Sequence, residues 1–469
     1  MKVARTPPRL PDAAPIAASV HAARRAAVLE SLRAAGGGVA LVAAAPVAVR
    51  NRDSEYPYRQ NSDFLYLCGF DEPDALLLLD SDGTPGDAAH PPATLFCRPR
   101  DPDHEIWEGP RHGPEGARQA LGLEAAWPNA MREERVTEAL GRARTLWFPF
   151  ADEWLAGELR RWCGALRQRR DLAPPIALRD LAPALEALRV RKDAGEIALM
   201  RRAGAISALA HRRAMQACRP GMHEYELEAE LLHTFRRHGA QAPAYASIVA
   251  AGANACVLHY PAGAARIADG DLVLIDAGAE VEGYAGDISR TFPANGRFSD
   301  AQRTLYEIVL AAQQAAIDAT RTGARFDDGH QAALRILVEG MLDTGLLARD
   351  VHGNVEDVIA SGAYRRFYMH RTGHWLGLDV HDCGDYRDPP AADAAAHAPR
   401  ASRLLQEGMV LTIEPGLYVR AAADVPPRFH DIGIRIEDDA LVTADGCTLL
   451  TRDVPVRCDE IEALMRDCR

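Results

Sequence analysis

Acidic residues interrupt the apolar, strand-like segments in the second half of this chain. The four residues are Asp276 and Asp287 in "LVLIDAGAEVEGYAGDISRTF", Glu414 in "MVLTIEPGLY" and Glu437 in "GIRIEDD". Aspartate is depleted in strands, and burying an ionised carboxylate costs on the order of several kcal/mol unless something compensates its charge. The fold must therefore supply that compensation close to these strands.

The first two carboxylates belong to one predicted hairpin. Asp276 and Asp287 lie in apolar strands that a short turn near Glu280–Gly283 joins. Residues at equal distances from the turn of an antiparallel hairpin face each other, so we expect the two side chains to lie roughly opposite one another. Like charges at that distance repel, and a bound cation is the simplest way to keep both ionised. The alternative is that one of the two aspartates caps a turn.

The other two carboxylates follow the same pattern. Glu414 ends a β-branched strand. In "GIRIEDD" the two-residue period of a strand places Arg435 and Glu437 on one face, with Ile434 and Ile436 on the other. The alternative here is a half-exposed strand with an ion pair between Arg435 and Glu437 on the surface.

Taken together, the four carboxylates carry about four negative charges, which two divalent ions would neutralise. Oxygen ligands with a single imidazole suit Mn²⁺, Co²⁺ or Zn²⁺ better than they suit a thiolate zinc site. Two such ions that share carboxylates activate a bridging hydroxide as a nucleophile at neutral pH. The predicted chemistry is hydrolysis.

Three histidines cluster in "MHRTGHWLGLDVHD", residues 369–382: His370, His374 and His381. A spacing of four residues would place His370 and His374 on one face of a helix, as in helical zinc sites. However, two glycines interrupt the segment, and Arg371 stands where a helical zinc protease carries a glutamate. The helical zinc site is therefore rejected, and the role of each histidine stays open at this point.

Composition narrows the class of protein. The chain has 469 residues and a net charge of −12, which argues against a nucleic-acid partner. No window approaches the roughly 20 apolar residues that span a bilayer, and the N-terminus lacks the pattern of a secretion signal. The nine cysteines form no CxxC pair. We therefore expect a cytoplasmic protein that does not bind membranes.

Two domains are predicted after a short N-terminal arm. Apolar runs alternate with helical segments in the first part, which predicts an α/β domain with a mixed sheet. A proline-rich linker follows, and a long helix begins near Asp193. The second part combines strong helical stretches with glycine-punctuated strands and is predicted to be α+β. The predicted boundaries are 1–20 for the arm, 21–180 for the first domain and 181–469 for the second; the helical stretches lie near 193–218, 224–238, 301–320 and 328–346.

The motifs "IDAG…GYAGDISRTF", "HWLGLDVHD", "TIEPGLY" and "GIRIEDD", in this order, resemble the proline-directed metallopeptidases of the pita-bread fold, and most of all the aminopeptidase P family. "DSEYPYRQNSDFLYLCGFDEPDALLLL" is similar to the N-terminal domain of bacterial members. The similarity runs from about residue 20 to residue 465. It implies an α/β N-terminal domain with a mixed sheet and an α+β pita-bread catalytic domain. It also implies that the substrates are peptides with proline in the second position, from which the first residue is released.

The resemblance also implies which residues hold the metal ions, and it selects one histidine. Two divalent ions per subunit are expected, with Mn²⁺ first and Zn²⁺ or Co²⁺ as alternatives. Asp276 would chelate one ion, His374 and Glu414 the second, and Asp287 and Glu437 would bridge both.

Catalytic and substrate-binding roles follow from the same resemblance. His259, His370 and His381 would face the substrate. Glu414 would carry a proton from the hydroxide to the leaving prolyl nitrogen. His381 would stabilise the oxyanion, and the α-amine of the substrate would bind the ion chelated by Asp276.

Further residues are implied around this centre. Arg435, and Tyr418 with it, would orient a ligand without binding the ions. The family's N-terminal domain helps to close the active site of a neighbouring subunit, so a homo-oligomer (dimer or tetramer) is expected, with Trp107 as the lid residue and Asp53 as a weaker candidate. The loop at 386–404 is longer than the family pattern, and we expect His397 within it to be solvated.

Three other functions remain to be separated from this one. A prolidase has the same ligands but accepts only dipeptides. A creatinase-like amidinohydrolase shares the fold without metal ions, and a binding protein on the same fold would be expected to have lost ligands. All five ligands are present here, which argues against the last two functions.

Overall fold

The computed structural model describes residues 10–87, 89–389 and 399–466. The chain divides between Leu188 and Arg189 into two compact units. The N-terminal unit is Ile16–Leu188, and the C-terminal unit contains the chain from Arg189 onward and the residues just before Ile16. No helix in these described ranges is long and apolar enough to cross a membrane. His397, predicted to be solvated, lies outside the described residues.

The N-terminal unit is built on a six-stranded sheet in the order β6-β5-β4-β1-β7-β8. β1 pairs antiparallel with β4 and parallel with β7, so the sheet is mixed, as the alternation of apolar runs and helices predicted. The strands are β1 Val39–Ala43, β4 Leu76–Asp80, β5 Ala93–Cys97, β6 Ala125–Pro128, β7 Thr145–Phe148 and β8 Ala177–Asp180, with a separate pair β2 Val49–Asn51 and β3 Ser54–Glu55.

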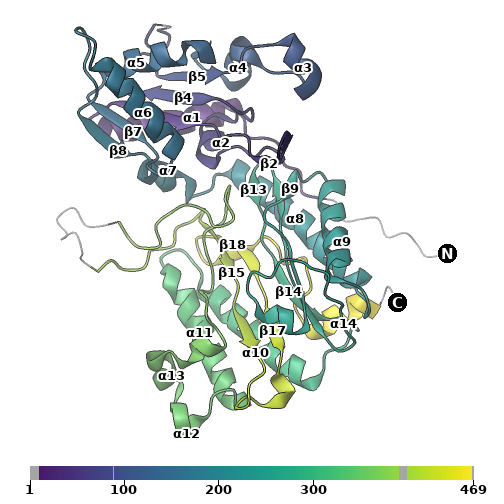
Figure 1. Ribbon diagram of the computed structural model, residues 1–469. Helices are drawn as coiled ribbons and strands as arrows, with labels where there is room; N and C mark the ends of the chain where they lie inside the picture. The colour runs from purple at the N-terminus through teal and green to yellow at the C-terminus, as the bar shows by residue number, and fades with distance from the viewer. Residues whose placement is uncertain (1–9, 88, 390–398, 467–469) are drawn as a thin grey trace. The chain divides into compact units, whose positions relative to one another are not determined.

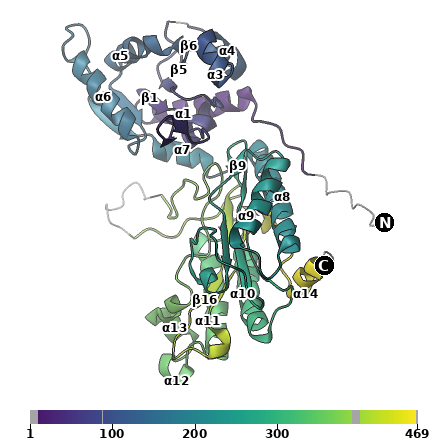
Figure 2. The same ribbon diagram turned by 45° about the vertical axis from the view of Figure 1, so that its right-hand side comes forward.

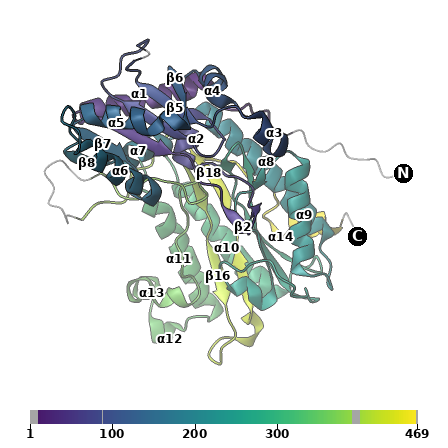
Figure 3. The same ribbon diagram turned by 45° about the horizontal axis from the view of Figure 1, so that its top comes forward.

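Helices cover this sheet and bury its apolar runs. α5 and α6 lie side by side (Figure 3) and pack on β1 and β5 through a core that contains Leu41, Phe96 and Trp162. These contacts explain why every residue of β1, β4 and β5 is buried. The helices are α1 Ala18–Ala34, α2 Ser62–Cys68, α3 Pro102–Glu108, α4 Gly113–Leu121, α5 Arg132–Arg142, α6 Glu153–Leu166 and α7 Ala182–Arg189.

The C-terminal unit contains several short antiparallel sheets rather than one large one. Their strand orders are β10-β11-β14, β13-β12-β9, β15-β18-β19 and β16-β17. The strands are β9 Ala242–Pro243, β10 Ile248–Ala251, β11 Leu272–Asp276, β12 Ala279–Val281, β13 Tyr284–Ala285, β14 Ser289–Pro293, β15 Val410–Ile413, β16 Gly416–Val419, β17 Ile432–Arg435, β18 Asp438–Val442 and β19 Cys447–Leu449.

Two helix pairs accompany these sheets. α8 lies beside α9, and α10 beside α11 (Figures 1 and 2). α8 begins where the sequence predicted, because Asp193 caps its N-terminus in a capping box with Glu196. The helices are α8 Ala194–Ala217, α9 Glu224–Arg237, α10 Asp300–Ala319, α11 Phe326–Thr344, α12 Arg349–His352, α13 Val355–Ser361 and α14 Cys458–Arg466. The predicted α+β class of this unit is confirmed.

The predicted hairpin exists, but its register differs from the expectation. β11 pairs with β14 so that Asp276 faces Ser289, not Asp287. The turn lies at Glu282–Gly283, whose φ values of 51° and 81° are both positive, as a two-residue type I′ turn requires. This turn moves the centre of the hairpin by one residue. Asp287 therefore lies two residues from the partner of Asp276, on the same face, as a diagonal neighbour.

The segment "GIRIEDD" also differs from a single strand. β17 ends at Arg435 and pairs with β16, whereas β18 begins at Asp438 and pairs with β15. Arg435 and Glu437 are 4% and 2% exposed, which excludes the half-exposed strand with a surface ion pair. Both side chains are buried at the junction of two sheets.

Candidate metal centre and active site

The C-terminal unit contains a cavity of about 830 Å³ that brings together most of the predicted site residues. Its walls come from the hairpin, from the histidine segment and from the ends of β15 and β17. The predicted residues that line it are His259, Asp276, Asp287, His370, His374, His381, Glu414, Arg435 and Glu437.

Three of these residues form a compact donor group. One ligand atom each from Asp287, His374 and Glu437 lies within 4.8 Å of the others. His374 Nε2 is 3.6 Å from Asp287 Oδ2 and also 3.6 Å from Glu414 Oε1. Four residues that are distant in sequence thus place their donor atoms around one point.

Asp276 joins this group through two neighbours. The hydroxyl of Tyr245 donates to Asp276 Oδ1 at 2.5 Å and also contacts the carboxylate of Asp287. Arg435 Nη2 donates to Asp276 Oδ2 at 2.7 Å. Arg435 therefore pairs with Asp276 rather than with Glu437, its neighbour on the predicted strand face. Ser289 connects Arg435 to Glu437, since its hydroxyl accepts from Arg435 Nε and donates to Glu437 Oε2.

Burial makes these carboxylates hard to ionise without a cation. Burial, together with the charge of Asp276, raises the pKa of Asp287 above its usual range. Burial and the charge of Asp287 raise the pKa of Glu437 well above its usual value. Burial also raises the pKa of Glu414, although Arg435 acts in the opposite direction. The four carboxylates share one guanidinium, so three negative charges are left to be balanced.

This donor set fits divalent metal ions. It offers carboxylate oxygens and one imidazole, with no thiolate among the donors, which is the chemistry preferred by Mn²⁺ and tolerated by Zn²⁺ or Co²⁺. Two divalent ions would bring four positive charges to the three uncompensated negative charges. A bound hydroxide would balance the remaining positive charge.

The backbone holds His374 in an orientation suited to a ligand. Its Nδ1 lies 2.9 Å from the carbonyl oxygen of Trp375, which fixes the proton on Nδ1 and leaves Nε2 to face the carboxylates. Its peptide pairs with Thr412 of β15: Thr412 N donates to His374 O, and His374 N donates to Thr412 Oγ1. The segment is an extended loop along β15 rather than a helix, so the rejection of a helical zinc site is confirmed.

His370 occupies a different position. Its Nδ1 donates to the carbonyl of Arg371 at 2.7 Å, so its Nε2 accepts from the hydroxyl of Tyr418 at 2.9 Å. Tyr418 in turn accepts from Arg435 Nη1 at 3.0 Å. Burial and then the charge of Arg435 lower the pKa of His370 to about 4. A neutral imidazole and a tyrosine thus connect the cavity wall to Arg435.

His381 and His259 are the more exposed histidines of the cavity. The rings of His374 and His381 meet edge to face, with centroids 4.3 Å apart. Burial, followed by the charge of His374, lowers the pKa of His381, so its ring is neutral at neutral pH and has one N–H to donate.

The remaining candidates belong to the N-terminal unit. Trp107 lies on α3 and is 86% exposed, and Asp53 is exposed in the turn between β2 and β3. Neither residue has a contact that tests its predicted role.

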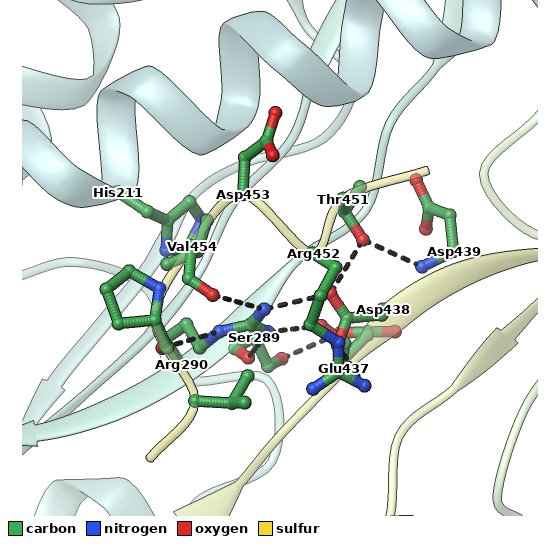
Figure 4. A network of polar contacts seen from close by, with 12 residues as sticks. His211, Ser289, Arg290, Glu437, Asp438, Asp439, Thr451, Arg452, Asp453 and Val454 are labelled. Carbon is green, nitrogen blue, oxygen red and sulfur yellow. Dashed lines mark hydrogen bonds and ion pairs between the residues drawn. The ribbon is translucent and has the colours of Figure 1, made fainter. Parts of the chain in front are cut away.

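Behind Glu437, a buried ionic network holds the start of β18 (Figure 4). Arg290, which is fully buried, donates through Nη1 to the carbonyl of Glu437 at 2.5 Å and through Nη2 to Asp438 Oδ1 at 2.8 Å. Thr451 Oγ1 donates to the same carboxylate and accepts from Asp439 N. The carbonyl of Glu437 and the two residues that follow it are therefore fixed by side chains that do not line the cavity.

The structure adds residues to the site that sequence reasoning did not find. Tyr245 contacts both aspartates of the hairpin, but "APAYASIV" has neither a charge nor a period that distinguishes this tyrosine. Asp327 and Arg371 form an ion pair and both line the cavity. The Arg371 side chain is 55% exposed although it borders the cavity.

Comparisons with known proteins agree with this geometry. The profile described as metallopeptidase family M24 matches residues 198–444, and the profile of the aminopeptidase P N-terminal domain matches residues 21–147. The Xaa-Pro aminopeptidase of Escherichia coli (strain K12) is 44% identical over 448 residues, which cover 94% of this chain and 96% of that protein.

Solved structures give the same result. The structure of Pseudomonas aeruginosa aminopeptidase PepP matches with a TM-score of 0.90 at 43% identity, covering 97% of this chain and 99% of that one. Aminopeptidase P from E. coli with the inhibitor Pro-Leu matches with a TM-score of 0.89 at 42% identity, covering 97% of this chain and all of that one (100%).

Proposed function

This chain belongs to metallopeptidase family M24 and is an Xaa-Pro aminopeptidase, and from that premise we propose that two divalent ions in the cavity of its C-terminal unit serve the hydrolysis. The resemblance seen in the motifs, with its mixed-sheet N-terminal domain and pita-bread catalytic domain, is confirmed. The observation that carries the proposal is the convergence of Asp287, His374 and Glu437 within 4.8 Å, next to Asp276 and Glu414.

We assign the ligands as the motifs implied. Asp276 would hold one ion and His374 and Glu414 the other, and Asp287 and Glu437 would bridge the two; all five residues line the cavity. Bound there, two divalent ions supply a hydroxide nucleophile at neutral pH and stabilise the negative charge that develops on the scissile carbonyl. Mn²⁺ is the proposed metal, because the donors are oxygens with one imidazole.

Glu414 moves the proton in this proposal. Burial raises the pKa of its carboxyl group, so this group holds a proton more readily than an exposed glutamate does. It takes the proton of the attacking hydroxide and gives it to the prolyl nitrogen, which needs one when the C–N bond breaks. The N–H of His381 donates to the oxygen of the tetrahedral intermediate.

A chain of hydrogen bonds orients the metal ligands and the substrate-facing histidine. It runs through Arg435, Tyr418 and His370. Arg435 orients Asp276 directly and Glu437 through Ser289. Tyr418 accepts from Arg435 and donates to His370, and the rings of His370 and His259 line the cavity. In this proposal, the fixed positions of His370 and His259 restrict the orientation of a peptide in the cavity.

The substrates in this proposal are peptides with proline in the second position that continue beyond it. Assembly into a dimer or tetramer, in which Trp107 closes the site of a neighbouring subunit and Asp53 assists, stays a prediction. A sedimentation measurement of the purified chain tests the assembly.

The substrate proposal is tested by comparing kcat/KM for Ala-Pro-Ala, Ala-Pro and Ala-Ala-Ala with Mn²⁺ present. Ala-Pro-Ala is expected to be the best of the three. Replacing proline should forfeit about 1–3 kcal/mol of apolar contact, or roughly 10- to 200-fold in kcat/KM. A preference for the dipeptide, with longer peptides refused, would replace this proposal with a prolidase.

A further inference from the structure

A second group of buried charges lies close to the active-site loop but does not line the cavity. Asp382, whose side chain is 1% exposed, accepts from Arg189 Nη2 at 2.6 Å and from Lys192 Nζ at 2.9 Å. Arg189 also pairs with Asp379 at 2.8 Å. We call these four residues the Asp382 cluster. The side chains of Arg189, Lys192 and Asp382 are buried, whereas that of Asp379 is 48% exposed.

Asp382 is ionised in this cluster. Burial alone would raise the pKa of its carboxyl group, but the adjacent charges of Lys192 and Arg189 outweigh burial and lower that pKa. A buried ion pair is weak evidence for stability, because apolar residues of similar volume often replace one without loss. The two hydrogen-bonded ion pairs fix the orientation of the Asp382 side chain.

The cluster closes the loop that follows His374. Asp382 N donates to the carbonyl of Trp375 at 2.9 Å, and Gly377 N donates to the carbonyl of Asp379 at 3.1 Å. Lys192 is itself fixed where the chain enters the C-terminal unit, since its N–H donates to Gly408 O at 2.8 Å. The loop is therefore tied to the first residues of this unit.

Packing at Gly377 shows how closely these parts fit. A Cβ atom at Gly377 would lie 2.3 Å from Asp382 Oδ2 and 2.9 Å from Cε of Lys192. Only glycine leaves room for the ion pair at this point.

The two histidines of the loop depend on different anchors. His374 is held by β15, through its reciprocal hydrogen bonds with Thr412. His381 has no such anchor: within the described residues, no hydrogen bond joins its ring to another group, and its ring contact is with His374. The residue that follows it, Asp382, is held by Arg189 and Lys192.

We propose that Arg189 and Lys192 are positioning residues, which hold the His381 imidazole against the scissile carbonyl by fixing Asp382. The inference rests on the proposed function, since it concerns the residue that stabilises the oxyanion. A displacement of about 1 Å at such a group can cost on the order of 100-fold in rate. Loosening the cluster should therefore lower kcat, while the two hydrogen bonds between His374 and Thr412 of β15 keep this metal ligand in place.

The test uses Lys192→Met, Asp382→Asn and the double variant, each with Ala-Pro-Ala and Mn²⁺. Each single variant removes one partner of the buried Lys192–Asp382 ion pair, whereas the double variant removes both. Arg303→Met is the matched control, because it removes an ion pair of the same unit, Arg303 Nη2–Glu462 Oε1 at 2.9 Å, that lies outside the loop. For every variant, kcat, KM, bound manganese and the urea midpoint are measured.

Both single variants are expected to lose about 10- to 100-fold in kcat, with KM within about threefold and manganese content unchanged. In the double variant the urea midpoint should recover but kcat should not, because the Lys192–Asp382 bond is still absent. Arg303→Met should lower the midpoint alone. If Lys192→Met does not fold, Arg189→Lys carries the test, since it keeps the charge but has a side chain one bond shorter than the one whose Nη2 donates to Asp379 and Asp382.

The inference is overturned if the single variants retain kcat within about twofold of the wild type, or if kcat returns together with the midpoint in the double variant. Loss of manganese in the single variants also overturns it, because the cluster would then act on the metal ligands. Failure of the wild-type protein to cleave Ala-Pro-Ala is a different result and counts against the proposed function itself.

Discussion

The hydroxyl of Tyr245 donates to Asp276 Oδ1 at 2.5 Å, from 31 residues earlier in the chain. The same oxygen also contacts the carboxylate of Asp287. Burial and the charge of Asp276 raise the pKa of Asp287. One tyrosine oxygen thus connects the two aspartates of the hairpin.

Tyr245→Phe removes this donor and tests its importance. The metal-free variant is expected to be less stable by about 1–3 kcal/mol, because buried carboxylate oxygens lose their hydrogen-bond partner. With saturating Mn²⁺ the loss should be smaller, since the ions then compensate the same oxygens. Urea unfolding with and without Mn²⁺ measures both values.

Tyr386→Phe is the control for this prediction. Tyr386 lines the same cavity, but its hydroxyl accepts a hydrogen bond from Trp375 N, whereas the hydroxyl of Tyr245 donates to a carboxylate. Its loss of stability should be equal with and without Mn²⁺. A Tyr245→Phe variant that behaves in the same way would show that Tyr245 does not compensate the ligands.

A second prediction concerns the network behind Glu437. Arg290→Met leaves Asp438 and several carbonyl groups without their buried donor and should cost about 3–5 kcal/mol of unfolding free energy. Arg452→Met removes another partner of Asp438, but the Arg452 side chain is 29% exposed and its contact is 3.3 Å long. That variant should cost about 1 kcal/mol or less. Equal losses in urea unfolding would contradict the central place given to Arg290.

A third prediction concerns acid stability. His211 is fully buried in α8, where its Nε2 donates to Ala277 O at 2.9 Å. Burial lowers the pKa of His211 to about 4. The folded protein therefore binds fewer protons at His211 than the unfolded chain does. The neutral, buried His211 contributes fully to the free energy of unfolding above the unfolded pKa of about 6.5, and this contribution is lost as the pH falls towards 4.

His211→Gln keeps a donor for Ala277 O and removes the titration. The wild type should lose up to about 3 kcal/mol more than the variant between pH 7 and pH 4. Urea unfolding at several pH values provides the comparison. Parallel stability curves would show that His211 does not titrate as the structure requires.

The sequence predicted the elements better than it predicted their contacts. The mixed α/β pattern of the first domain and the four long helices were found from apolar periodicity, which is a local signal, but β6 and β8 were not predicted as strands. The register of the hairpin was wrong by one residue at its centre, because the positive φ values of Glu282 and Gly283 cannot be read from apolar pattern. The break between β17 and β18 was missed for a similar reason, since "GIRIEDD" alternates regularly throughout.

At the site, the sequence identified the acidic residues because a carboxylate in an apolar strand needs compensation. It could not identify the neutral residues that support them. Tyr245 and Ser289 act through single hydrogen bonds, and neither polarity nor spacing distinguishes them from other hydroxyl residues. Asp382 was not recognised either, since its partners Arg189 and Lys192 lie about 190 residues away in the chain.

In the proposed metal centre, five residues hold two ions for hydrolysis. The most direct test removes all metal, restores Mn²⁺, separates the excess and measures bound manganese and Ala-Pro-Ala cleavage on one sample. The wild type should approach two ions per chain and His374→Ala should lose one, whereas His381→Ala should keep both while its kcat falls about 100-fold or more. Manganese near zero with full activity in the wild type would contradict the account.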